Sequence, residues 1–323
     1  MKTALLCSGQ GSQYVGMIKD LAEKYSQISD LVKQADEIVG YPLSNICFEG
    51  PADKLKETRY TQPALFLHSA AIYTVISDKS LVINGGNTNH LSLNSNHCFD
   101  AVAGHSVGEY AALYIAGVLS FEDALNLVSL RGQLMFAAGE ETQGTMFAVI
   151  NLADDIIIEI CKNLTDASKN LYVVPANFNS PGQVVVSGSA EHLRNNIHLF
   201  KEAGARMTKE LTVSGAFHSP LMLPAQNKLE QAINSLQFND AKVPVYVNVS
   251  AKSLTKAEEI RASLIKQLTA PVLWTQTILK MNSAGINKFI EIGAGQVLQG
   301  LVKRIVEGAK VSGFDKAEDI EKN

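Results

Sequence analysis

The feature that most constrains the fold is the pentapeptide at residues 104–108, which has the pattern G-x-S-x-G with Ser106 at its centre. An apolar run at 99–103 precedes it, and a helical pattern follows it to about Ala116, with Gly117 placed to stop the helix. A serine between a strand and a helix lies on a sharp turn, which exposes its hydroxyl above the sheet. The pattern predicts an α/β fold with Ser106 as a nucleophile. The alternative is an ordinary tight turn whose serine caps the helix.

Strand and helix patterns alternate along the chain on both sides of this turn. Such alternation predicts a mostly parallel sheet that is covered by helices on both faces. Apolar runs predict strands at 3–8, 99–103, 243–249 and 288–292, and periodic patterns predict helices at 65–76, 121–138, 221–236 and 257–268.

Residues 144–213 differ from the rest of the chain in their pattern of predicted elements, which has the order β-α-β-β-α-β. That order is the ferredoxin-like arrangement. We therefore expect a large α/β domain of residues 1–143 and 214–323, with an inserted ferredoxin-like subdomain of residues 144–213. The Asn-rich stretch at 83–97 is expected to be a surface loop. The expected strands of the insertion are 146–151, 171–176, 183–187 and 206–213, and its expected helices are 154–164 and 190–203.

Composition narrows the class of protein and of partner. The chain is 46% hydrophobic and has a formal net charge of -4, so it has enough apolar residues for a large core. So mild a charge predicts neither nucleic-acid binding nor attraction to anionic membranes. The four cysteines lie far apart without a C-x-x-C pair, which argues against a zinc site or a disulfide framework. The N-terminal apolar run is too short for a signal peptide or a membrane span, so we expect a cytoplasmic protein. We also expect a monomer.

A serine nucleophile needs a base, and the chain has seven histidines. His105 is expected to point away from the neighbouring Ser106, and His68 lies in an apolar helix as a core residue. Elimination leaves His218, on a loop that follows the insertion. Since no Asp or Glu is clearly placed as a third member, we expect a Ser-His dyad. The remaining histidines lie in segments expected to face solvent and are His90, His97, His192 and His198.

Arg131 lies in the apolar stripe of its helix, four residues after Leu127 and three before Leu134. A guanidinium on a core-facing stripe needs an anionic or hydrogen-bonding partner. Two interpretations remain open. Arg131 either forms a structural salt bridge with a buried carboxylate, or it binds the carboxylate of an acyl substrate through two parallel hydrogen bonds.

The glycine-rich loop at 9–13, after the first strand, is a second place where a backbone can approach a ligand closely. It can supply a second oxyanion donor beside the amide of Val107, which lies at the start of the helix after Ser106. It can equally cradle a phosphate. It lacks the lysine of G-x-x-x-x-G-K-[ST] and the full G-x-G-x-x-G, which disfavours nucleotide binding.

Taken together, these segments resemble the malonyl-CoA:acyl carrier protein transacylases, including the acyltransferase domains of polyketide synthases. The resemblance runs in order along nearly the whole chain and is therefore more specific than any one motif. The matching segments are 9–13, 61–64, 104–110, 131–132, 177–181, 217–219, 271–274 and 291–293.

The resemblance implies an α/β-hydrolase-like large domain with a ferredoxin-like insertion. It implies that Ser106 is the nucleophile and that His218 is the base, oriented by a backbone carbonyl at the position of Gln267. It also implies three groups of substrate contacts, which are an oxyanion hole of the amides of Gln10 and Val107, Arg131 on the malonyl carboxylate, and Gln62 near the same pocket.

The activity implied by the resemblance is a ping-pong transfer of malonyl from malonyl-CoA to an acyl carrier protein, through an ester on Ser106. No metal and no bound cofactor are expected. Phe217 stands beside the expected base, where its ring can fill the space that a 2-methyl branch would need. The loop around His218 is closer to the polyketide type, which leaves open whether the pathway is fatty-acid or polyketide synthesis. The competing functions are an acyl-thioester hydrolase and a non-catalytic docking module for carrier proteins.

Overall fold

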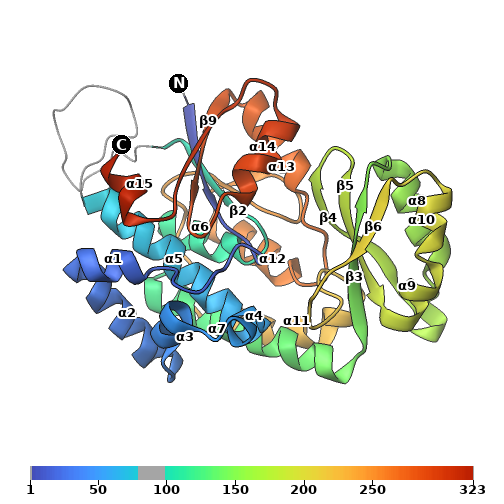
Figure 1. The fold of residues 1–323 in the computed structure, drawn as a ribbon, viewed down its shortest axis with the longest axis horizontal. Coiled ribbons are helices and arrows are strands. Elements are labelled where there is room, and N and C mark those ends of the chain that lie inside the picture. Colours follow the sequence, from blue (N-terminus) through green and yellow to red (C-terminus); the bar gives the residue numbers. More distant parts are fainter. Residues whose placement is uncertain (1, 79–98, 323) are drawn as a thin grey trace.

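The computed structural model describes residues 2–78 and 99–322, which form two sheets with helices around them (Figure 1). Among the described strands of the larger sheet, neighbours are parallel except for the last pair. The prediction of an α/β fold with a mostly parallel sheet is therefore confirmed. In spatial order the six strands are β10 (Lys310–Phe314), β9 (Ile286–Ile292), β1 (Lys2–Cys7), β2 (Ala101–Gly104), β7 (Val245–Tyr246) and β8 (Ser253–Leu254).

Strands β1 and β2 lie at the centre of this sheet because both of their faces are apolar. Along β1, Leu5 packs into one hydrophobic core and its neighbour Leu6 packs into the other. Parallel pairing from Ala4 with Ala101 to Cys7 with Gly104 brings the carboxyl ends of the two strands together. The loop after β1 and the serine turn after β2 therefore meet at one edge of the sheet.

Helices cover both faces of the larger sheet. The face of Leu5 packs against α2, α5, α6, α7, α11 and α12, and the opposite face packs against α13 and α14. The helices of this part are α1 (Lys19–Lys24), α2 (Ser26–Val39), α3 (Leu43–Glu49), α4 (Ala52–Lys56), α5 (Thr58–Asp78), α6 (Gly108–Ile115), α7 (Phe121–Glu141), α11 (Leu223–Ser235), α12 (Ala257–Lys266), α13 (Trp274–Ser283), α14 (Val297–Ile305) and α15 (Ala317–Glu321), with a 3₁₀ turn, η2, at Pro220–Met222.

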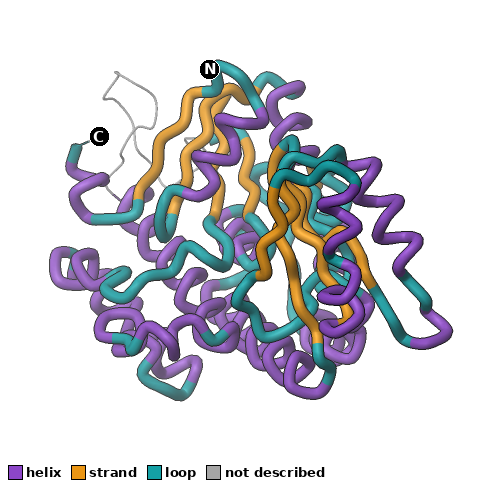
Figure 2. The backbone as a smooth tube through the Cα atoms, turned by 45° about the vertical axis from the view of Figure 1, so that its right-hand side comes forward, coloured by secondary structure: helices purple, strands orange, loops and turns teal. Residues whose placement is uncertain are grey.

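The second sheet is antiparallel and has the spatial order β4-β5-β3-β6. In chain order these are its second, third, first and fourth strands, which is the ferredoxin-like arrangement that the sequence predicts. Its helices lie on the side away from the larger sheet (Figures 1 and 2). The elements are β3 (Gly144–Ile150), α8 (Asp154–Leu164), η1 (Ala167–Lys169), β4 (Val173–Ser180), β5 (Gln183–Ser189), α9 (Ala190–Asn196), α10 (His198–Glu202) and β6 (Met207–Glu210).

Several predicted bounds differ from the structure. The helix predicted at 65–76 begins at Thr58, and the strand predicted at 206–213 ends at Glu210. Two other elements are interrupted or much shorter than predicted. The helix predicted at 190–203 is broken at Ile197, directly after Asn196, whose side chain donates to the carbonyl of His192. The strand predicted at 243–249 is only two residues long, since the Asn248 amide leaves the sheet to bind a side chain of α6. The elements that the sequence patterns do not predict include helices α1 to α4, α13 and α15 and strands β8 and β10.

The second sheet contacts the larger part of the protein along β4. The amide of Phe178 donates to the carbonyl of Val272 at 2.9 Å, and the amide of Val272 donates to Ala176 at 2.8 Å. Thr275 at the start of α13 donates to the carbonyl of Phe178. These bonds tie the β4 segment to the larger part of the protein. The division of the chain at 144 and 213 stays a prediction.

Two sequence expectations concern other features. The Asn-rich stretch at 83–97 lies outside the described residues. Within the described residues, no helix is long and apolar enough to cross a membrane.

Candidate active site

Ser106 lies on a strained turn between β2 and α6. Its φ is 51°, a left-handed conformation that is uncommon for a residue with a side chain. Both flanking glycines are required by close backbone contacts. A Cβ on Gly104 would lie 2.0 Å from the carbonyl of Gly108, and one on Gly108 would lie 2.3 Å from the carbonyl oxygen of Cys7. The G-x-S-x-G pattern therefore produces the sharp turn expected from the sequence.

Asn248, which follows β7, holds this turn from the side. Its Oδ1 accepts from the Ser106 amide at 2.7 Å, and its Nδ2 donates to the carbonyl of Gly104 at 2.7 Å. The Ser106 amide is therefore occupied. By contrast, the amides of Val107 and Gln10 donate no hydrogen bond to any group in the described part of the chain. Both amides remain available to a ligand.

His218 completes a pair with the serine. Its Nε2 lies 2.8 Å from Ser106 Oγ, while its Nδ1 lies 3.0 Å from the carbonyl of Gln267 and 3.1 Å from that of Ala270. Because two carbonyls can only accept, Nδ1 carries the proton and Nε2 accepts from the serine hydroxyl. Burial, with the nearby charge of Arg131, lowers the pKa of His218 to about 3, so the ring is neutral at physiological pH.

Arg131, on α7, is 1% exposed and points its guanidinium at the same serine. Its Nη1 donates to Gln62 Oε1 at 2.6 Å, and its Nη2 donates to both Ser106 Oγ and Gln267 Oε1 at 3.1 Å. The salt bridge that was one of the two expectations for Arg131 is not formed within the described residues. The guanidinium is held by neutral oxygens, which leaves its positive charge without a directly paired carboxylate. The arginine ion pairs in this part of the chain belong to Arg59, Arg194 and Arg261.

A chain of side chains links Arg131 to the loop after β1. Gln62, on α5, donates through Nε2 to Thr58 Oγ1 at 3.1 Å, and Thr58 donates to Gln10 Oε1 at 2.8 Å. The loop also lies against the serine turn, since a Cβ on Gly9 would be 2.8 Å from the carbonyl oxygen of His105. Gln10, Gln62 and Arg131 thus come together around Ser106, although they are far apart in sequence.

Two further predicted residues occupy the immediate surroundings. Phe217 is buried in the large core next to His218, where a Cβ on Gly215 would touch its ring at 3.5 Å. His105 points away from the serine, as expected, and its Nε2 lies 2.8 Å from Asn179 Oδ1 on β4. His105 therefore joins the serine turn to the second sheet.

Sequence reasoning missed Glu109 and Asn248. Glu109 lies on α6, three residues after Ser106, and is fully buried. Its Oε2 accepts from the amide of Asn248 and from Gln267 Nε2, both at 2.9 Å. Burial raises the pKa of Glu109 to about 7. A carboxylate in an otherwise apolar helix was the available signal, of the same kind that identified Arg131. Asn248 carried no comparable signal, since it is one polar residue after a short strand.

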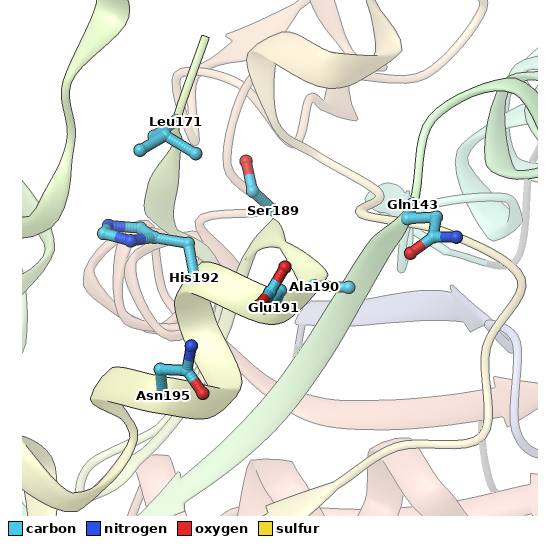
Figure 3. Close-up of a pocket in the computed structure, with 7 residues that line it drawn as sticks. All are labelled: Gln143, Leu171, Ser189, Ala190, Glu191, His192 and Asn195. Atoms are coloured by element: carbon cyan, nitrogen blue, oxygen red, sulfur yellow. The ribbon is translucent and has the colours of Figure 1, made fainter. Parts of the chain in front are cut away.

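The structure also has a pocket of about 350 Å³ beside α9 in the second sheet, away from this constellation (Figure 3). None of its lining residues is among the predicted site residues. Within the described residues, no group of three or more His, Cys, Asp or Glu side chains is arranged to hold a metal ion. The pocket is lined by Gln143, Leu171, Ser189, Ala190, Glu191, His192 and Asn195.

A parallel sheet that delivers a serine on a strained turn to a neutral histidine is the arrangement of α/β enzymes that react with acyl groups. Comparison with known proteins narrows this class. The chain belongs to the acyl transferase domain family, whose family model matches residues 4–321.

Individual relatives are similar over nearly the whole chain. The chain is 42% identical to a malonyl CoA-acyl carrier protein transacylase from Haemophilus influenzae, over 94% of this chain and 92% of the relative. It is 38% identical to one from Staphylococcus aureus, over 99% and 97%.

Solved structures agree with the sequence relatives. An acyl carrier protein S-malonyltransferase from Vibrio cholerae superimposes with a TM-score of 0.90 at 38% identity, covering 100% of this chain and 99% of that one. A malonyl-transacylase in complex with its type II PKS acyl-carrier protein gives a TM-score of 0.89 at 37% identity, covering 100% of both chains.

Proposed function

We propose that this acyltransferase moves a malonyl group from malonyl-CoA to the phosphopantetheine thiol of an acyl carrier protein, through an ester on Ser106. The observation that carries the proposal is the buried guanidinium of Arg131, whose Nη2 lies 3.1 Å from Ser106 Oγ and which pairs directly with no carboxylate of the described residues. An acyl group with a free carboxylate supplies the missing partner. The names of the relatives support the same substrate and the same carrier.

In the first half-reaction His218 acts as the general base. Its neutral Nε2 takes the proton of the Ser106 hydroxyl as Oγ attacks the thioester carbonyl of malonyl-CoA. The negative charge that develops on the carbonyl oxygen is stabilised by the unoccupied amides of Val107 and Gln10. The tetrahedral intermediate collapses, the C–S bond breaks, and the CoA sulfur leaves with the proton that His218 returns.

The second half-reaction runs the same steps with a different thiol. The phosphopantetheine sulfur of the carrier protein gives its proton to His218 and attacks the carbonyl of the malonyl ester. The C–O bond to Ser106 then breaks, and Oγ recovers the proton from Nε2. The carbonyls of Gln267 and Ala270, which hold Nδ1–H, stabilise the imidazolium that forms in both halves.

The direct test is mass spectrometry of the intact protein and of its Ser106 peptide after incubation with malonyl-CoA. We expect a malonyl ester on Ser106, and its loss as malonyl-carrier product when the carrier protein is added. Ser106→Ala should abolish both loading and transfer while the melting temperature stays close to that of the wild type. Undiminished labelling of that variant would overturn the assignment. Equal rates of thioester loss with and without carrier protein would instead indicate a hydrolase.

A further inference from the structure

Glu109 is a buried carboxylate that the proposed mechanism does not use. Its exposed fraction is 0%, and burying a carboxylate is costly unless hydrogen bonds compensate. Both of its hydrogen bonds go to Oε2, from the Asn248 amide and from Gln267 Nε2. Oε1 has no hydrogen-bond partner among the described residues. Burying a carboxylate with so few hydrogen bonds lowers the stability of the fold, which indicates that Glu109 has a role besides stability.

The two residues that Glu109 binds are those that hold the serine turn and the arginine. Asn248 bridges Gly104 and Ser106 through its side-chain amide. Gln267 donates through Nε2 to the carbonyl of Ser106 at 3.1 Å as well as to Glu109. Glu109 is therefore one bond away from every side-chain contact that fixes the backbone of the strained turn.

The carboxylate also decides which way the Gln267 amide faces. Since a carboxylate only accepts, it binds the Nε2 end of the amide, and the Oε1 end then faces Arg131 at 3.1 Å. The reversed amide would place an N–H group against the guanidinium and an oxygen against the carboxylate. Both contacts would be repulsive, so Glu109 and Arg131 together allow one orientation.

The same arrangement places opposite charges close together without pairing them. Burial lowers the pKa of Arg131 and raises the pKa of Glu109. The charges of Tyr110 and Glu109 oppose the first shift, and the charge of Arg131 opposes the second. Gln267 lies between Glu109 and Arg131 and accepts from one while donating to the other. The guanidinium is thus fixed in place and partly stabilised, yet its own donors still face the serine.

We infer that Glu109 is a positioning residue for acyl transfer, whose carboxylate fixes the backbone of Asn248 and orients the side-chain amide of Gln267 and, through them, the Ser106 turn and the Arg131 guanidinium. The inference rests on the proposed function for the roles of Ser106 and Arg131. Glu109 itself touches neither the nucleophile's hydroxyl nor the acyl group.

The test compares Glu109→Ala and Glu109→Gln with a matched control, Glu291→Gln. Glu291 is also buried, at 1% exposure, accepts from two backbone amides, and has a pKa raised by burial to about 7, but it lies on β9 and caps α14. Two reactions are followed in the full-length protein. One is the rate at which a small fluorophosphonate labels Ser106, where Oγ attacks phosphorus and fluoride leaves. The other is the ratio of malonyl to acetyl loading from the CoA thioesters.

We expect Glu109→Ala to slow fluorophosphonate labelling by about tenfold or more, because misplacement of about 1 Å in a site of this kind costs up to ~100-fold. The malonyl-to-acetyl ratio should fall as well, since Arg131 loses its fixed orientation. Glu109→Gln keeps one accepting oxygen and should recover part of the rate. Glu291→Gln should leave both readouts close to those of the wild type.

A pH profile separates positioning by the carboxylate from a merely structural role. Within the described residues, the charged and titratable groups near Glu109 are Arg131 on α7 and Tyr110 on α6. Tyr110 keeps its proton between pH 5 and 8 because burial raises its pKa. Arg131 stays charged in this range because a guanidinium keeps its proton in proteins, even where burial lowers its pKa. His218 is already neutral there. Wild-type labelling should therefore rise as the carboxylate forms near pH 7, whereas Glu109→Gln should be flat and should meet the wild type near pH 5.5.

Two results would overturn the inference. One is wild-type labelling by a folded Glu109→Ala, and the other is a Glu109→Gln profile that keeps the wild-type rise. If Glu109→Ala does not fold, the Glu109→Gln profile decides alone. Failure of the proposed function looks different, since the wild type would then form no malonyl ester while the fluorophosphonate results stood unchanged.

Discussion

At the scale of single residues, the site keeps two buried opposite charges apart with a neutral amide. Glu109 and Arg131 both bind Gln267, from its two ends. A direct pair between them would occupy donors of the guanidinium, and a buried salt bridge adds little stability because desolvation offsets its attraction. Separation leaves Arg131 in contact with Ser106 Oγ and able to receive a second carboxylate.

This arrangement makes Arg131→Ala the most discriminating substitution for substrate choice. Charge-assisted hydrogen bonds contribute roughly 1.5–3 kcal/mol each, so we expect malonyl loading to fall by about two orders of magnitude or more. Acetyl, which has no carboxylate, should be much less affected. Arg131→Lys should rescue only part of the loss, because a point charge does not reproduce the planar fork.

The measurement is kcat/KM with malonyl-CoA and acetyl-CoA, alongside a melting curve of each variant. A parallel loss with both substrates and a lowered melting temperature would indicate that Arg131 is only structural. It would remove the observation on which the substrate proposal depends.

At the scale of secondary-structure elements, a buried carboxylate at the end of a strand accepts hydrogen bonds from the first amides of a helix. Glu291, at the end of β9, accepts from the amides of Leu298 and Gln299, both at 3.1 Å. These are amides of the first turn of α14, whose N-cap residue makes no side-chain cap of its own. The strand thus caps a helix that packs against it.

Because Glu291 is buried, its cap should make stability depend on pH. Burial raises its pKa from the ordinary 4.5 to about 7, so between these values the folded protein holds a proton that the unfolded chain releases. The free energy of unfolding of the wild type therefore decreases as pH rises through this window. Glu291→Gln removes this term. Its stability relative to the wild type should improve from pH 5 to pH 8.5, by on the order of 3 kcal/mol.

Chemical denaturation of both proteins at the two pH values measures this difference. The comparison is between two proteins at each pH, so the titration of other groups cancels. An unchanged difference between pH 5 and pH 8.5 would show that Glu291 has the same pKa in the folded and unfolded chains.

At the scale of the whole molecule, the two sheets are joined where the chain leaves the larger part and returns to it (Figure 1). These two crossings, residues 139–144 and 214–216, lie against each other so closely that there is no room for a side chain between them. A Cβ on Gly139 would lie 1.7 Å from the carbonyl oxygen of Ser214, and one on Gly144 would lie 2.4 Å from the amide nitrogen of Ala216. The returning crossing leads directly into Phe217 and His218, so the packing of the crossings also places the base.

We expect Gly144→Ala to force the crossings apart and to lower the free energy of unfolding by about 1–3 kcal/mol. It should also slow fluorophosphonate labelling of Ser106, because His218 moves with the returning chain. The matched control is Gly300→Ala on α14, where an added Cβ meets nothing within 4 Å. That control should be neutral or stabilising by up to ~1 kcal/mol, with an unchanged labelling rate. Equal effects from the two substitutions would contradict the argument.

The sequence by itself determined the features that depend on local patterns. Apolar runs that alternate with helical patterns predicted the parallel sheet, because a strand that is buried on both faces has a nearly continuous run of apolar residues. The order of elements predicted the ferredoxin-like sheet. Two glycines around Ser106 predicted the sharp turn, since only glycine avoids the backbone contacts that the structure shows. One charge in an apolar stripe drew attention to Arg131.

The tertiary structure alone decided which distant side chains meet at the serine. Asn248 binds an amide 142 residues earlier in the chain, and Gln267 binds a carbonyl 161 residues earlier. Single amide side chains leave no periodic mark in a sequence, and their value comes from the geometry of the groups that surround them. Side-chain hydrogen bonds of this kind also lie beside the end of β7 and the break at Ile197. Apolar burial can be predicted from the sequence because each residue shows its own hydrophobicity, whereas a polar pair forms only once the fold has brought its two partners together.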